Sequence, residues 1–147
     1  MQRKLPSMPN AVLAFLLAIS AGFSWAGPTT KESDPFTGEW GWAIGFKGLA
    51  VPVQAKFTRN ADKLNGGVRF GNRKPLPIID GKIEGRKITF QVEDKSKESA
   101  ILCKYTGELK DGKITGKLRL SIPAPSGNGE ESELDWEAQR MQVPINW

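Results

Sequence analysis

The chain contains no histidine, and this absence narrows its function more than any other property of its composition. Without histidine there is no histidine-based catalytic triad, no histidine general base and no ordinary zinc site. The single cysteine, Cys103, excludes an intrachain disulfide, so we expect a fold held together by its hydrophobic core alone. We therefore expect no catalytic residues, no bound metal and no cofactor.

Long apolar runs are also lacking outside the N-terminus. Arg3 and Lys4 precede the apolar segment 11–19, and the small residues Ser24 and Ala26 occupy the two positions that a signal peptidase reads, which is the pattern of a secretory signal peptide cleaved after residue 26. The alternative, a membrane anchor, requires about 18 or more apolar residues. We expect a secreted or periplasmic protein with no stable membrane insertion after cleavage.

The basic residues are spread along this sequence and do not form a cluster. The formal net charge of +5 falls to +3 when residues 1–26 are removed, because Arg3 and Lys4 leave with them. A mildly basic net charge with dispersed basic residues favours solubility and does not indicate a particular partner. Export also separates the protein from nucleic acid, so we expect no nucleic-acid partner.

The sequence after residue 26 has a period of two and no convincing helical periodicity. Residues 27–36 are polar with Pro and Gly, and indicate a disordered lead-in. From residue 37 to 140, apolar and polar residues alternate in short runs between turns, as in half-buried β-strands. The expected strands are 39–46, 50–59, 64–70, 75–83, 87–93, 100–110, 113–121 and 132–140, followed by an aperiodic tail, 141–147.

Short antiparallel strands in this number favour a closed sheet. An open meander of about eight strands leaves two long edges, and closure removes both. Glycine recurs after the turns in 62–66, 80–85 and 111–116, and closed barrels need such bending points. We predict an all-β fold, an antiparallel up-and-down β-barrel of about eight strands rather than a sandwich, with a bulge near Asp80 and Gly81.

Two sites resemble a known group of barrels. Thr37-Gly38-Glu39-Trp40 opens the first expected strand and Arg140 ends the last, which resembles the signature of the calycin group (lipocalins, fatty-acid-binding proteins and avidins). The resemblance implies that Trp40 seals the barrel and that Arg140 packs over its indole ring. The polar residues with which avidins contact biotin have no match at inward positions here, so biotin binding is not expected.

A second resemblance covers most of the chain after residue 36. The segments 37–40, 76–83, 104–109 and 135–138 resemble an uncharacterised extracellular β domain of exported bacterial proteins. That resemblance implies a fold and a compartment, and it implies no activity.

Inward-facing aromatic residues are the candidates for a ligand site. Trp42, Phe57, Phe90 and Tyr105 would line a cavity for a small apolar ligand, with the Tyr105 hydroxyl as its polar group. The alternative is that aromatic side chains fill the barrel. Cys103 shares the face of Tyr105 and is expected to be a buried, inert thiol.

Three functions remain open at this point. The first is an exported non-catalytic β-barrel binding module for a small apolar ligand. The second is an accessory or interaction domain, with a side-chain-filled barrel, that contacts another exported protein or the cell envelope through its surface. The third, an enzyme, is least favoured because histidine is absent, and the outward pair Asp135 and Glu137 is explained by solvated acids on a strand.

Overall fold

The structure is a computed structural model that describes residues 34–96, 100–144, 146 and 147. The expected signal peptide, residues 1–26, and the lead-in as far as residue 33 lie outside these residues. None of the described segments is a helix long and apolar enough to span a membrane.

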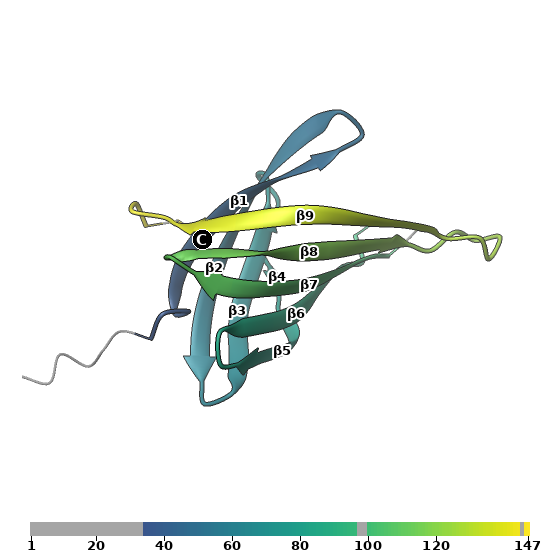
Figure 1. Ribbon diagram of the computed structural model, residues 1–147. Helices are drawn as coiled ribbons and strands as arrows, with labels where there is room; N and C mark the ends of the chain where they lie inside the picture. Colours follow the sequence, from purple (N-terminus) through teal and green to yellow (C-terminus); the bar gives the residue numbers. More distant parts are fainter. Residues whose placement is uncertain (1–33, 97–99, 145) are drawn as a thin grey trace, which may run out of the picture. The chain divides into compact units, whose positions relative to one another are not determined.

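The described residues form a closed β-barrel with one short additional strand (Figure 1). The nine strands are β1 (Gly38–Phe46), β2 (Leu49–Asn60), β3 (Lys63–Phe70), β4 (Leu76–Pro77), β5 (Ile79–Glu84), β6 (Lys87–Asp94), β7 (Ile101–Lys110), β8 (Lys113–Ile122) and β9 (Glu130–Arg140). All pairings are antiparallel; β2 pairs with β3 and β9 pairs with β1, which closes the circuit of eight strands, while β4 lies against β3. The predicted up-and-down barrel is confirmed.

The period of two fixes which side chains enter the barrel. Trp40, Trp42 and Ile44 of β1 are buried, whereas Ala43 and Gly45, which point to the opposite face, are exposed. The same alternation runs through β6, where Ile88, Phe90 and Val92 face inward. Every buried side chain among the described residues belongs to a hydrophobic residue, so the barrel interior is a single apolar core.

The stretch 75–83 forms two short strands in place of the single one we expected. Prolines at 75 and 77 remove backbone N–H donors and interrupt the ladder. The register of β5 against β6 shifts between Ile79 and Lys82, and Asp80 has a φ of 50°. A Cβ on Gly81 would lie 2.1 Å from the carbonyl oxygen of Leu64, so only glycine fits there. The bulge predicted near Asp80 and Gly81 is present.

One end of the barrel is sealed around Trp40. Its side chain is 0% exposed, and its indole N–H donates to the carbonyl oxygen of Phe36 at 2.9 Å. The Arg140 guanidinium carbon lies 4.9 Å from the centroid of the Trp40 ring, and its Nη1 donates to the carbonyl oxygen of Thr37 at 3.0 Å. Phe36, which we had assigned to the lead-in, is 1% exposed and belongs to this seal.

The contact between Arg140 and Trp40 has a measurable consequence. Arg140→Ala is expected to destabilise the wild type by about 0.5–1 kcal/mol more than it destabilises the Trp40→Ala protein, because an exposed cation–π contact contributes about that much. Urea unfolding of the four proteins of this double-mutant cycle gives the coupling energy. Strictly additive effects would show that the two side chains do not interact.

Candidate functional site

The four aromatic residues predicted to line a cavity meet in the middle of the barrel, where they pack against each other. The Phe90 and Tyr105 rings stack with centroids 4.6 Å apart, and Phe57 meets Phe90 edge-on at 5.4 Å. Trp42 lies edge-on to Tyr105 at 5.7 Å. With Trp136, which contacts Trp42, Phe90 and Tyr105, these rings form a filled aromatic layer.

Two polar atoms are buried in this layer with no hydrogen-bond partner among the described residues other than each other. They are the indole nitrogen of Trp42 and the hydroxyl oxygen of Tyr105, whereas Trp136 donates to the carbonyl oxygen of Thr106 at 3.0 Å. Burial raises the pKa of Tyr105 well above its ordinary value. The hydroxyl therefore stays protonated at neutral pH, and Tyr105 does not supply a base.

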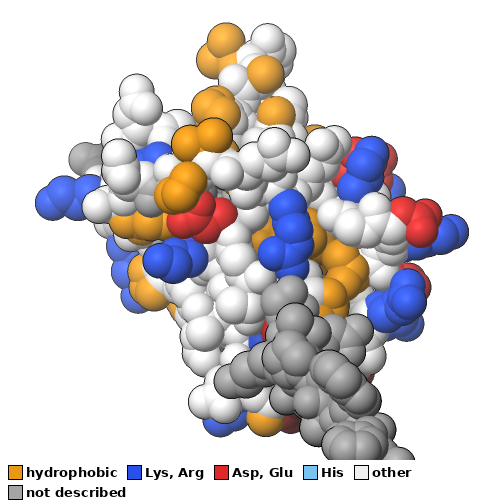
Figure 2. Space-filling view, turned by 90° about the vertical axis from the view of Figure 1, so that its left-hand side faces the viewer, with side chains coloured by type: hydrophobic (Ala, Val, Ile, Leu, Met, Phe, Trp, Pro, Cys, Tyr) orange, Lys and Arg blue, Asp and Glu red, His pale blue; other side chains and the backbone are white. Residues whose placement is uncertain are grey.

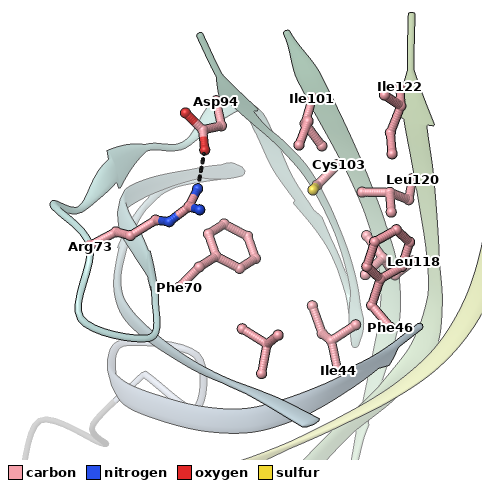
Figure 3. Close-up of a pocket in the computed structure, with 11 residues that line it drawn as sticks. Ile44, Phe46, Phe70, Arg73, Asp94, Ile101, Cys103, Leu118, Leu120 and Ile122 are labelled. Atoms are coloured by element: carbon pink, nitrogen blue, oxygen red, sulfur yellow. Dashed lines mark hydrogen bonds and ion pairs between the residues drawn. The ribbon is translucent and has the colours of Figure 1, made fainter. Parts of the chain in front are cut away.

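A cavity of about 240 Å³ lies inside the barrel beside the aromatic layer. Figure 3 shows the side chains that surround it. None of the four predicted residues lines it. Its walls are mostly aliphatic and come from both sides of the barrel: Ile44 and Phe46 of β1, Val51 of β2, Phe70 of β3, Ile101 and Cys103 of β7, and Leu118, Leu120 and Ile122 of β8, with Arg73 and Asp94 at the rim.

The change in side-chain type along the strands explains why the barrel is filled at one level and open at another. On β1, Trp40 and Trp42 lie outside the cavity, and Ile44, further along the strand, lies in its wall. On β7, Tyr105 lies outside the cavity and Cys103 lies in its wall. An aliphatic side chain or a thiol reaches less far toward the barrel axis than an indole or phenol ring does. Eight strands enclose just enough width for one layer of large side chains, so smaller ones leave space.

An ion pair marks the rim of the cavity. Arg73, in the turn after β3, donates from Nη1 to Asp94 Oδ2, at the end of β6, at 2.9 Å, which links these two segments on one side of the opening (Figure 3). Hydrogen bonds from Ser96 and the charge of Arg73 hold the pKa of Asp94 below its ordinary value. Neither residue was singled out in the sequence, because 21 positions separate them and the pairing of β3 and of β6 with the intervening β5 brings them together.

Cys103 is a buried thiol in the cavity wall. Burial, with a smaller contribution from the charge of Asp94, raises the pKa of Cys103 to about 12. The thiolate, not the thiol, is the nucleophile, so Cys103 is chemically inert at neutral pH.

The reactivity of Cys103 tests its position. At pH 8, its reaction with a thiol reagent is expected to be about 1,000-fold slower than that of an exposed thiol with a pKa near 9. The rate should then rise about tenfold per pH unit from pH 8 to 11, because the thiolate fraction rises at that pace below the pKa. A rate that levels off near pH 9, with the fold intact by circular dichroism, would show that the thiol is not buried.

No group of three or more His, Cys, Asp and Glu side chains suited to hold a metal ion occurs among residues 34–96, 100–144, 146 and 147. Comparison with protein-family models, with curated proteins and with solved structures finds no match to this chain. The fold itself, a closed antiparallel barrel of eight strands, is compatible with that of the calycin group.

Proposed function

We propose that this protein is an exported, non-catalytic binding module that holds one small apolar molecule in the cavity between β1 and β8. The observation that carries the proposal is the cavity of about 240 Å³ with a mostly apolar wall of aliphatic and phenylalanine side chains, in a barrel whose aromatic layer is filled. Apolar cavities of about 150 Å³ stay dry and bind benzene. By proportion, this cavity suits a ligand of roughly ten non-hydrogen atoms.

The chemistry of the wall supports binding in preference to catalysis. The three groups in the wall that titrate are Arg73, Asp94 and Cys103. Arg73 and Asp94 are paired with each other, and the pKa of Cys103 is about 12. The pKa of Asp94 lies below its ordinary value and that of Cys103 far above neutrality, so neither group has a pKa near neutral pH, where a general acid or base is most effective.

Export and origin are part of the same proposal. Residues 1–26 have the pattern of a signal peptide, and the chain resembles an uncharacterised extracellular domain of exported bacterial proteins. A secreted or periplasmic barrel that carries a small apolar molecule through water is consistent with both features. Neither feature identifies the molecule.

Native mass spectrometry of the protein purified from its source tests this function. We expect a co-purifying small molecule on the wild type and its loss from Leu120→Trp, whose indole would occupy the cavity. Val143→Trp is the matched control, because Val143 is 71% exposed and lies outside the wall. A wild type free of any bound molecule, which also takes up none of a panel of small apolar compounds, would reject the proposal.

A second candidate is an interaction domain that contacts another exported protein or the cell envelope. Leu49 and Val143 are 70% and 71% exposed, and Trp147 is 43% exposed. Figure 2 shows hydrophobic side chains on the part of the molecule that projects at the top of the view. This part is the β1–β2 hairpin of Figure 1, and Leu49 begins its second strand. This candidate would be favoured if the wild type, without a bound small molecule, captured a defined exported partner and the Leu49→Lys protein did not.

A further inference from the structure

The barrel has one seam at which two long strands barely pair. β1 and β9 share a ladder only at Trp40 with Arg140 and at Gly41 with Gln139, whereas β1 pairs with β2 along its whole length and β8 pairs with β9 from Ile122 to Lys113. Beyond Gly41 along the chain, the hairpin formed by β1 and β2 diverges from β9 (Figure 1). We call the two diverging segments, Trp42–Phe46 of β1 and Glu130–Ala138 of β9, the β1–β9 seam.

A hydrogen bond next to the seam, between Met141 and Glu39, shows which backbone groups of β1 and β9 point toward each other. The N–H of Met141 donates to the carbonyl oxygen of Glu39 at 2.9 Å, so odd-numbered residues of β1 and of β9 direct their backbone groups toward each other. Ala43 and Gly45 on one side, and Asp135 and Glu133 on the other, therefore point N–H and C=O groups into the seam without a ladder partner.

Pro52 supports this assignment independently. It is the β2 residue opposite Ala43, and proline has no N–H to donate. Ala43 therefore sits at a position where β1 and β2 exchange no hydrogen bonds, and its own N–H faces the seam. Two strand edges with unpaired backbone groups that face one gap form a template for a further strand.

We propose that the β1–β9 seam binds an extended peptide segment of another protein by strand addition, and that this segment alternates basic with apolar residues. In strand addition, main-chain hydrogen bonds supply affinity and alternate side chains supply specificity. The residues of β9 that offer the backbone groups are the ones whose side chains point outward, and four of them are acidic: Glu131, Glu133, Asp135 and Glu137.

The strand already paired with β9 shows which side chains this acidic row accepts. Three basic residues of β8 form ion pairs with this row. Nζ of Lys113 lies 3.1 Å from Oε1 of Glu137, and Nζ of Lys117 lies 2.5 Å from Oδ1 of Asp135. Nη2 of Arg119 lies 3.6 Å from Oε2 of Glu133. Between these basic residues, Ile114 and Leu118 of β8 enter the core. A segment added on the opposite edge of β9 meets the same acids, so the same alternation of outward Lys or Arg and inward aliphatic residues fits it.

The β1 side of the seam leaves room for such a segment. Its outward residues at positions 43 and 45 are alanine and glycine, and nothing lies within 4 Å of a Cβ built on Gly45. A surface depression lined by Ala43, by residues 115–117 of β8 and by residues 135–137 of β9 lies beside the seam. An exposed ion pair between Lys47, in the turn after β1, and Glu130 of β9, with Nζ and Oε2 4.0 Å apart, crosses the far end of the seam and would have to open when a segment binds.

A labelled synthetic peptide tests the proposal on the protein itself. The probe is the heptapeptide Lys-Leu-Arg-Leu-Lys-Ile-Arg with blocked ends, and binding is followed by fluorescence anisotropy. We expect saturable binding that weakens at high salt, and no binding of the peptide in which glutamate replaces each basic residue. Ala43→Pro is expected to weaken binding at least about tenfold, because it removes one seam-facing N–H and adds a ring.

Two further variants separate this effect from a change in folding. Ala43→Ser keeps the N–H and should bind as the wild type does, whereas Asp135→Lys should weaken binding of the basic probe and leave circular dichroism unchanged. Hydrogen exchange at Ala43, Gly45 and Asp135 should slow on peptide binding, because the added strand covers those amides. Equal binding by wild type and Ala43→Pro, or absence of exchange protection at these amides, would overturn the proposal. A dimer of this chain that Ala43→Pro dissociates would also overturn it, since a second copy would then be the occupant.

Discussion

Replacing Trp40 by alanine is expected to lower the free energy of unfolding by about 3–5 kcal/mol, the range for large aromatic residues in well-packed cores. Trp40 is 0% exposed, contacts Phe57 with ring centroids 6.5 Å apart and donates to the Phe36 carbonyl oxygen at 2.9 Å. Truncation would empty the sealed end of the barrel and leave that carbonyl without its donor. Urea unfolding followed by circular dichroism measures the change.

Trp147→Ala provides the matched control for this result. Trp147 is 43% exposed, and Arg69 lies over its ring on the outside of the barrel at 5.6 Å. Its loss should cost about 1 kcal/mol or less, because an exposed cation–π contact contributes about 0.5–1 kcal/mol. A Trp40→Ala cost below about 1 kcal/mol would show that the indole does not seal the barrel.

Gly116→Ala is expected to destabilise the barrel by about 3 kcal/mol or more, which is the upper range for an added methyl group that the backbone must move to admit. A Cβ at Gly116 would lie 1.9 Å from the carbonyl oxygen of Thr106 and 2.6 Å from the Cα of Gly107. That same carbonyl oxygen accepts the indole N–H of Trp136 at 3.0 Å. The substitution therefore displaces both the β7 backbone and a core indole.

Gly45→Ala tests whether the effect is specific to crowding. Gly45 also lies within a strand, yet nothing lies within 4 Å of a Cβ built on it. Its replacement should change the free energy of unfolding by about 0.5–1 kcal/mol at most, and in the stabilising direction. If Gly116→Ala and Gly45→Ala had equal effects in urea unfolding, close approach of the backbone at Gly116 would be refuted.

Much of this fold could be predicted from the sequence because a half-buried strand writes its period directly into the chain. The alternation in β1, β2 and β6 through β9 identified the strands to within about two residues, and the cost of open edges favoured closure. The sequence was less informative at 75–83, where prolines and the close approach of Gly81 to Leu64 divide one expected strand into two. That division depends on a neighbouring strand and cannot be found from local pattern.

The candidate site was harder to predict, and the reason is geometrical. Parity tells which face a side chain occupies, but not at which height along the barrel axis it meets side chains from distant strands. Trp42 and Ile44 share a parity and a strand, yet Trp42 lies in the filled aromatic layer and Ile44 in the cavity wall. The sequence offered the aromatic residues as candidates for a lining, with a barrel filled by aromatic side chains as the alternative, and at their level the rings pack against each other and fill the space.

The central claim is that the cavity binds a small apolar molecule, and a nuclear magnetic resonance titration with naphthalene tests it most directly. Naphthalene has a size that matches roughly ten non-hydrogen atoms. We predict saturable shifts of the methyl signals of Ile44, Leu118 and Ile122 in the wild type and in Val143→Trp, and none in Leu120→Trp. Absence of saturable shifts in the wild type, or identical shifts in Leu120→Trp, would contradict the account.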